Sequence, residues 1–352
     1  MEKKLSEQKC PACGAPLRFD PESGKSVCDW CGMSYDIPTE EDENLDNGPS
    51  DASIPENAEE LPIYNCISCG AEIVADAVSA SLKCPYCGNN IVLTEKVSGG
   101  LRPDGIIPFK IDKKSLPAAV QSFYKGRKLL PSHFFDESSI EDLCGVYVPF
   151  WLYNCTYRGT VAYDGTKVSS ARDGDYVIST TAHYDVERAI EMQFTDIPVD
   201  GSARLEDALM DSIEPFDMSG VVPFRMSYLS GFFAERFDKD SDEVRERAEN
   251  RMYSSALDVA NANAMTDYTY SSLDRRSDTL HPDELEAKYV LLPVYTFNVN
   301  YGGKQYSFAM NGQTGKVVGD VPTDKKKSLL YRWGTFAAIF AAIMLIVSFL
   351  SC

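Results

Sequence analysis

Residues 148–159 read VPFWLYNCTYRG, and residues 292–303 read LPVYTFNVNYGG. The two stretches share a proline, an asparagine, a tyrosine and a final glycine at matching positions, which indicates an internal repeat. We interpret them as two similar β-hairpins, and the Gly302-Gly303 pair predicts the turn of the second one.

Three helices are expected among these strands. The first opens at Ser115 and Pro117, and the second covers residues 205–213. The longest begins at Asp240, where Glu243 completes a capping box, and it carries Val244, Ala248 and Met252 on one face. Strands and helices together predict one β-rich α+β body domain over residues 101–322, large enough for a core of its own.

Eight of the eleven cysteines lie before residue 90, in two sets with identical spacing. Each set has a Cys-x2-Cys pair, fourteen intervening residues and a second pair, and every pair is followed by glycine. Two such turns on facing hairpins close a tetrahedron of thiolates around zinc at ~2.3 Å per bond. Glycine allows the positive φ that the turn toward the sulfurs often needs. We therefore predict two zinc ribbons, with the ligands Cys10, Cys13, Cys28, Cys31, Cys66, Cys69, Cys84 and Cys87.

Four thiolates fill the coordination sphere of zinc and leave no position for water or substrate. The cofactors expected are therefore two structural Zn²⁺ ions, one in each ribbon. Neither ribbon can bury a useful core alone, so the metal should supply most of its folding energy, ~10–16 kcal/mol in small zinc modules. Because a Cys-x2-Cys pair can also form a disulfide, a redox role stays open.

The composition divides the chain into five parts. Residues 39–62 are acidic and poor in aromatic side chains, which is typical of a flexible linker. The predicted domains are zinc ribbon 1 over 1–36, the linker over 37–62, zinc ribbon 2 over 63–95, the body over 101–322, and a tail over 329–352 with a basic flank over 325–332.

The net charge of −19 disfavours nucleic acid as a partner, because an acidic body repels phosphate backbones. Neither ribbon compensates with a basic face: five lysines and arginines in residues 1–35 are matched by five acidic residues. Protein binding is therefore the preferred interpretation of the ribbons.

The tail, WGTFAAIFAAIMLIVSFLSC over residues 333–352, carries no charge. Twenty helical residues span ~30 Å, the thickness of the hydrocarbon core of a bilayer. Lys325, Lys326, Lys327 and Arg332 precede it, and such a basic flank stays on the cytoplasmic side. The N-terminus has no signal peptide. These features predict one C-terminal transmembrane helix and a single-pass protein of the inner membrane, with the N-terminus and the body in the cytoplasm.

No catalytic motif is recognisable. Residues 312–316, GQTGK, have two residues between the glycines and a valine after the lysine, so they predict a hairpin turn and not a phosphate loop. None of the three histidines is paired with a nucleophile in the sequence. We therefore expect no enzyme and infer no small-molecule substrate, although a polar pocket with perturbed titratable groups in the body would favour one.

The chain resembles a bacterial family of transcription-factor-IIB-type zinc-ribbon proteins with membrane-anchored tails. Besides the cysteine pairs, the resemblance rests on IIPFKIDKKSLPAAVQSFYKGRKLLPSHFF at 106–135, GVYVPFWLYN at 145–154, YLSGFFAERFD at 228–238 and AMNGQTGKVVGDVP at 309–322. It covers most of the chain and offers no catalytic residues. It implies an adaptor at the inner membrane surface, with flotillin-like or phage-shock-like membrane proteins as partners.

The function expected from the sequence is thus a membrane-anchored cytoplasmic zinc-ribbon adaptor or scaffold that binds proteins. One alternative is a transcription-related ribbon that binds nucleic acid, which predicts salt-dependent binding to DNA or RNA. The other is a redox or zinc sensor, which predicts reversible zinc release under mild oxidation.

Overall fold

The computed structural model describes most of the chain, and it is mainly a β structure. The residues that it describes are 10–15, 17–37, 61–65, 72–74, 92–97, 102–131, 134, 144–266 and 269–350. Strands make up 42% and helices 27% of the part of the chain that the structure describes, so the fold is mostly β.

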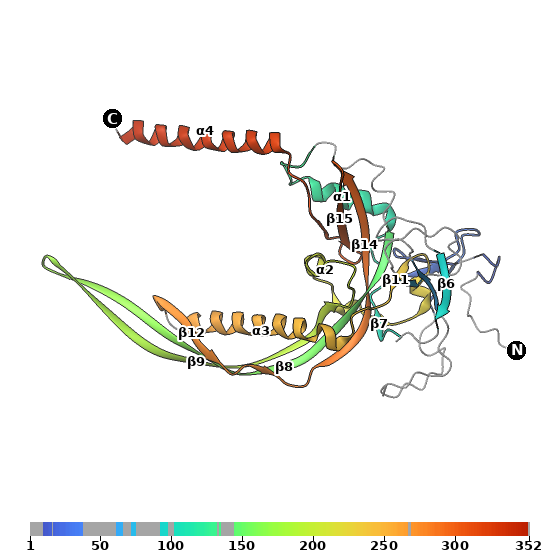
Figure 1. The fold of residues 1–352 in the computed structure, drawn as a ribbon, viewed down its shortest axis with the longest axis horizontal. Coiled ribbons are helices and arrows are strands. Elements are labelled where there is room, and N and C mark those ends of the chain that lie inside the picture. The colour runs from blue at the N-terminus through green and yellow to red at the C-terminus, as the bar shows by residue number, and fades with distance from the viewer. Residues whose placement is uncertain are drawn as a thin grey trace.

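The strands form one small sheet and one large sheet (Figure 1). The small sheet holds β1 (Arg18–Asp20), β2 (Lys25–Val27) and β3 (Ser34–Tyr35). The large sheet has thirteen strands: β4 (Leu61–Asn65), β5 (Glu72–Val74), β6 (Val92–Val97), β7 (Gly105–Ile106), β8 (Cys144–Asp173), β9 (Tyr176–Asp200), β10 (Val222–Pro223), β11 (Phe233–Glu235), β12 (Ser272–Asp278), β13 (His281–Pro282), β14 (Glu286–Tyr301), β15 (Lys304–Asn311) and β16 (Val317–Gly319).

The α-helices are α1 (Leu116–Tyr124), α2 (Asp207–Ile213), α3 (Ser241–Thr266) and α4 (Lys325–Leu350). The first three coincide with the three helices expected from the sequence. At the start of α3 the capping box forms as predicted: the Asp240 carboxylate accepts from the Glu243 amide at 2.9 Å, and Glu243 accepts from the Asp240 amide at 3.0 Å.

The repeated segments are the two central strands of the large sheet, β8 and β14, which pair antiparallel with Val148 opposite Leu292. The second hairpin is confirmed, since β14 turns at Gly302-Gly303 onto β15. The first hairpin is much longer than the repeat suggests. Strand β8 continues past Gly159 and turns at Gly174 onto β9. The predicted turn at 312–316 is also confirmed, because it joins β15 to β16.

Both faces of β8 are buried where the repeat lies. Val148, Phe150 and Leu152 pack in one cluster with Met210 and Ile213 of α2. The intervening side chains, Trp151 and Tyr153 among them, belong to a larger cluster on the opposite face. A strand covered on both faces reads as a nearly continuous apolar run, which explains the sequence VPFWLY.

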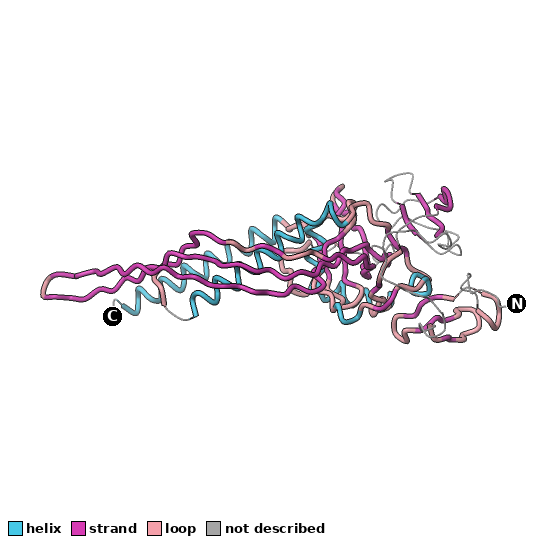
Figure 2. Tube along the Cα trace, turned by 90° about the horizontal axis from the view of Figure 1, so that it is seen from below, coloured by secondary structure: helices cyan, strands magenta, loops and turns pink. Residues whose placement is uncertain are grey.

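Beyond Gly159 the β8–β9 hairpin leaves the body as a long curved projection, and we call residues 159–190 the arm (Figure 2). Helix α3 lies along it through a row of small residues. Ala256, Ala260 and Ala264 are fully buried, and the last two pack against Val161 and Tyr163 of the arm. Small side chains at intervals of four let a helix approach a sheet closely.

The fold class predicted from the sequence is wrong in its overall form. The structure is a mostly β protein built on one large curled sheet, and not an α+β body with a separate transmembrane helix. The error arises in the arm, where exposed polar residues alternate with few buried ones. A strand without a continuous buried face gives no clear apolar period.

The predicted transmembrane helix over residues 329–352 is also wrong. No helix in the described part of the chain is long and apolar enough to cross a membrane. Four basic residues, Lys325 to Lys327 and Arg332, occupy the first two turns of α4. The predicted localisation, as a single-pass protein of the inner membrane, is therefore wrong as well.

Candidate metal centre

Four of the predicted ligands come together in ribbon 1. The sulfur atoms of Cys10, Cys13, Cys28 and Cys31 all lie within 4.8 Å of one another, the one such cluster in the described ranges. The Cys10–Cys31 and Cys13–Cys28 sulfur pairs are each 3.5 Å apart. Sulfurs at ~2.3 Å from a tetrahedral ion would be about 3.8 Å apart. The cluster therefore has the size of a four-thiolate metal site.

Two matching turns hold these sulfurs. Gly14 donates its amide to the Cys10 carbonyl at 2.8 Å, and Gly32 donates to the Cys28 carbonyl at 2.9 Å. Both glycines have φ of +73°, and no atom lies within 4 Å of where a Cβ would stand. Glycine is needed here for its backbone conformation and not for space, as the sequence predicted.

The cysteines differ in exposure and in their partners. Cys10 and Cys28 are buried, whereas Cys13 and Cys31 are exposed. The Tyr35 hydroxyl lies 3.4 Å from the Cys10 sulfur. This hydrogen bond lowers the pKa of the Cys10 thiol to about 6, which favours the thiolate that binds metal.

The donor set fits a metal ion. Four sulfur ligands in a tetrahedron are typical of zinc or iron, and they leave no open coordination position. The structure thus brings together four of the predicted ligands in an arrangement that could hold a metal ion, while the metal and its identity stay a prediction. The second set, Cys66, Cys69, Cys84 and Cys87, lies outside the described residues, as do residues 38–60 of the predicted linker.

Strands that flank the second set are described, and they belong to the large sheet. Asn65, the last residue of β4, pairs with Glu72, the first residue of β5. Strand β6 pairs with β4, and β5 pairs with β11 of the body. The strands of the predicted ribbon 2 therefore continue the sheet of the body.

Ribbon 1 is fixed to the body through Phe19 of β1. This side chain is 1% exposed, although it belongs to a small sheet of its own. Its ring centroid lies 5.4 Å from that of Tyr228 and 6.5 Å from that of Phe232. Its amide donates to the Ser230 carbonyl at 3.1 Å. Phe232 in turn stacks on Phe109 at 4.1 Å, so the ribbon is continuous with the main aromatic core.

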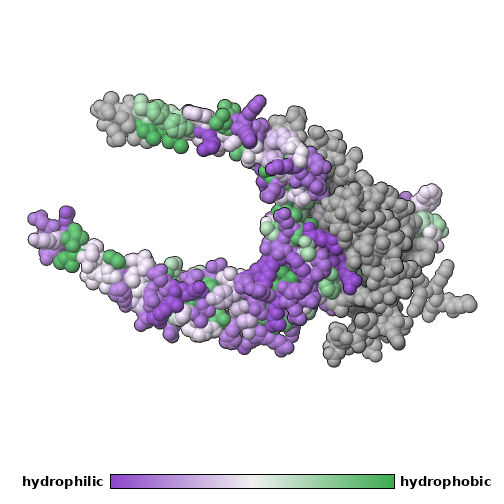
Figure 3. Space-filling model, viewed as in Figure 1, coloured by the Kyte–Doolittle hydropathy of each residue, from purple (hydrophilic) through white to green (hydrophobic). Residues whose placement is uncertain are grey.

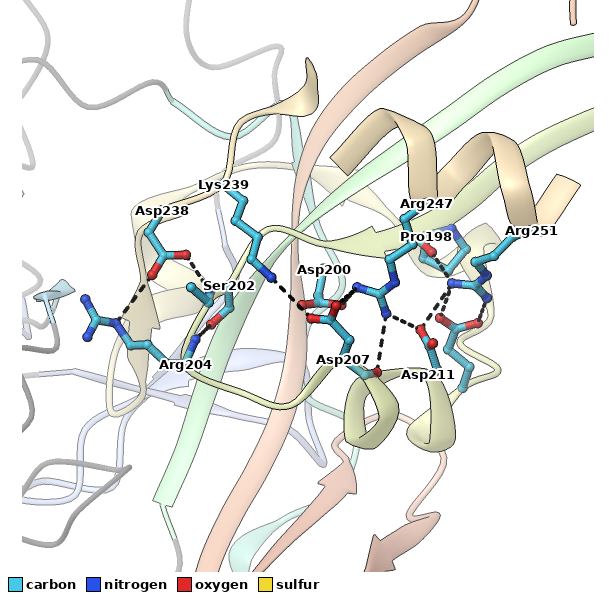
Figure 4. Close-up of polar contacts among 12 residues, drawn as sticks. Pro198, Asp200, Ser202, Arg204, Asp207, Asp211, Asp238, Lys239, Arg247 and Arg251 are labelled. Atoms are coloured by element: carbon cyan, nitrogen blue, oxygen red, sulfur yellow. Dashed lines mark hydrogen bonds and ion pairs between the residues drawn. The ribbon is translucent and has the colours of Figure 1, made fainter. Parts of the chain in front are cut away.

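A second cluster of charged residues lies where α2 and α3 meet the end of β9 (Figure 4). Arg247 of α3 bridges the Asp200 carboxylate at 2.6 Å and the Asp211 carboxylate at 2.5 Å. One turn later Arg251 pairs with Glu214 at 2.6 Å. Burial raises the pKa of Asp200, and the charge of Arg247 opposes that effect.

A neighbouring pair extends this arrangement. Glu235 of β11 is buried, accepts from the Ser202 hydroxyl at 2.9 Å, and lies 3.2 Å from the Arg204 guanidinium. Ala203 donates its amide to Asp238 at 2.6 Å. The cluster thus joins β9, β11, α2 and α3 by charged contacts, because each of these acids bonds to a neighbouring element.

This cluster was not predicted from the sequence. A signal was present, since Arg247 and Arg251 are four residues apart on one predicted helix, and Asp207 and Asp211 have the same spacing on another. The groove beside them has a volume of about 760 Å³ and is lined mainly by charged residues that include Lys239, Arg247 and Arg251. All three cations hold carboxylates, so the arrangement fastens the helices to the sheet.

The chain is similar to a bacterial protein along almost its whole length. It is 33% identical over 338 residues to the uncharacterized protein YdjG of Bacillus subtilis (strain 168), and the alignment covers 96% of each chain. No protein-family model matches the chain. No solved structure matches it either.

Proposed function

The chain belongs to the family of the Bacillus subtilis protein YdjG, and we propose that it is a zinc-stabilised adaptor that binds other proteins. The zinc is structural and not catalytic in this proposal, because four cysteine sulfurs complete the coordination sphere. We assign ribbon 1 to the transcription-factor-IIB type on its two Cys-x2-Cys-Gly turns.

The observation that carries the proposal is an exposed apolar surface at the metal site. Trp30 lies between Cys28 and Cys31 and is 85% exposed, and nearby Met33 is 50% exposed. Tryptophan and methionine are enriched in protein interfaces, and tryptophan is prominent among the residues that dominate binding energy. A rigid metal turn would present this side chain at little entropic cost.

The charges of ribbon 1 support a protein partner over a nucleic acid. Arg18 pairs with Asp29 at 3.3 Å, and Lys25 pairs with Asp36 at 2.8 Å. These cations are engaged by acids of the ribbon itself, whereas phosphate binding needs a basic surface. A transcription-related role would have to act through protein contacts.

The test is cross-linking and capture of the full chain from cells, with identification of the bound proteins. Trp30→Ala should lose the partners that ribbon 1 binds, while Tyr176→Ala, which truncates an aromatic of the arm that is 78% exposed, should keep them. Flotillin-like and phage-shock-like proteins, which the resemblance implies, are the first to look for. A partner set that is unchanged in Trp30→Ala and in Cys10→Ser would refute the proposal.

A redox or zinc sensor is a second candidate, and the exposure of Cys13 and Cys31 favours it. Exposed thiolates are the ones that oxidants reach first. This function predicts that mild oxidation releases zinc reversibly and leaves the melting of the body unchanged. Zinc release that requires unfolding of the body would exclude it.

A further inference from the structure

The outer end of the arm is a two-stranded ribbon that nothing in the described part of the chain covers. The packing of α3 reaches as far as Val161, Tyr163 and Val186, and β12 pairs with β8 only as far as Thr166. All residues from 168 to 181 are exposed. In Figure 3 this end of the arm stands apart from the rest of the molecule. A hairpin of two strands is at best marginally stable in water, so a partner strand would stabilise it.

Strand β9 forms one edge of the sheet here, because β8 is its only strand partner among the described residues. The direction of its main-chain groups follows from β8. Val168 donates its amide to Ser271, on the side away from β9, and it pairs with Thr181. Residues that face each other in an antiparallel ladder direct their main-chain groups either toward each other or both away. Thr181 therefore directs its N–H and C=O outward.

Alternation along the strand gives the same direction to Val177, Ser179 and His183. The outward edge thus offers a row of amides and carbonyls to a further strand. Proteins usually block such edges with charges, prolines or bulges. Residues 176–183 read YVISTTAH and contain no acidic or basic side chain other than His183, and no proline or glycine.

We propose that this edge pairs with the same edge of a second copy of the chain, which makes a homodimer with a four-stranded antiparallel sheet at its centre. A two-fold axis through Thr180 places Ser179 opposite Thr181 and Val177 opposite His183. This register keeps outward-directed residues opposite one another.

An uncharged stretch suits an uncharged partner strand, and a second copy offers one. The two-fold register places the uncharged residues 176–184 of one copy on those of the other. It also brings Asp175 of each copy opposite Asp185 of the other, at the two ends of the contact. Arg276 lies 2.8 Å from Asp185 and 2.9 Å from Asp164, so it offsets part of this repulsion.

The shape of the molecule permits this contact. The arm carries its outer end away from ribbon 1 and from the rest of the large sheet, so two bodies remain apart when the ends pair (Figure 1). Each body is strongly acidic, and the net charge of −19 opposes association at low salt. The contact is smaller than the ~1,600 Å² of a standard interface, so we expect a dissociation constant on the order of 10 μM.

The experiment is sedimentation equilibrium of the full chain across that concentration range. Thr181→Pro removes one outward amide from each copy and leaves the bonds to β8 in place, while Thr181→Ala is the control that keeps the amide. Two lost hydrogen bonds should weaken the dimer roughly 30-fold in Thr181→Pro. Thr181→Ala should stay near the wild-type affinity, and salt should strengthen the wild-type dimer.

Hydrogen exchange of the wild-type chain tests whether the outward edge of β9 is the dimer contact. Exchange of the amides at 177, 179, 181 and 183 should slow as the concentration of the wild-type chain passes the dissociation constant. The proposal is wrong if the chain is monomeric throughout, or if Thr181→Pro dimerises like Thr181→Ala, which would place the contact elsewhere, such as on α4. Dimerisation without concentration-dependent protection of these amides would overturn it equally.

Discussion

Replacement of Phe19 by alanine should release ribbon 1 from the body without unfolding either. The ring of Phe19 is the main apolar contact between them, with Tyr228 at 5.4 Å and Phe232 at 6.5 Å. Metal coordination, in contrast, lies within the ribbon and does not involve this side chain.

The free-energy cost of Phe19→Ala for the docking of ribbon 1 follows from the burial and the contacts of this side chain. Truncation of a buried phenylalanine costs ~3–5 kcal/mol, which includes the loss of its aromatic partners. The docking equilibrium should therefore shift by roughly 10²- to 5 × 10³-fold. The metal is worth ~10–16 kcal/mol in small zinc modules, so the ribbon itself should remain folded. The hydrogen bond from the residue 19 amide to Ser230 and the packing of Ile37 against the core would remain among the described residues.

Hydrogen exchange followed by mass spectrometry measures this shift directly. Peptides that contain residues 226–232 should exchange faster in Phe19→Ala, while metal content and the melting of the body stay near wild type. Trp30→Ala is the matched control, since it truncates an aromatic of the same ribbon that is 85% exposed. Its effect on stability should stay within about 0.5 kcal/mol. Unchanged exchange at 226–232 in Phe19→Ala would refute the docking argument, and so would loss of the metal.

Three further predictions concern the metal turn, the charged cluster and pH. Gly32→Ala should weaken metal binding about 5- to 30-fold, measured by competition with a chelator, because a φ of +73° costs a non-glycine residue ~1–2 kcal/mol. Gly126→Ala should leave metal binding unchanged, because neither a positive φ nor a close atom opposes a side chain there. Arg247→Met should lower stability by about 3–5 kcal/mol in urea unfolding because it leaves Asp200 buried and unpaired, and Asp200→Asn added to it should recover part of the loss. Hydrogen bonds from Ser219 lower the pKa of Asp217 below its ordinary value of 3.8. The stability that the ionised carboxylate contributes is therefore present above pH 3.8 and is lost as the pH falls through the pKa of the folded state. The gap in melting temperature between wild type and Asp217→Ala should narrow accordingly in acid.

Local features of the structure could be predicted from the sequence, because the residues that make them are neighbours in the chain. The capping box at Asp240 and Glu243 and the turn at Gly302-Gly303 depend on residues a few positions apart. The metal turns belong to the same class, since their spacing fixes where the sulfurs go.

Features that depend on distant residues could not be predicted. Phe19 is buried because the folded chain packs Tyr228 and Phe232 against it, and no residue near Phe19 in the sequence indicates these partners. The arm was missed because its outer residues are exposed on both faces, so no apolar period marks the strands. For α4, the uncharged run suggested a span, but basic residues take up the start of the helix.

X-ray absorption at the zinc edge tests the central claim, a four-thiolate zinc site in ribbon 1, most directly. The sample is the purified full chain in which Cys66 and Cys69 are replaced by serine, so that a complete set of four cysteines remains only in ribbon 1. The account predicts one zinc ion for each chain, with four sulfur neighbours at ~2.3 Å. A chain without zinc, or an ion with nitrogen or oxygen ligands in place of some sulfurs, would contradict it.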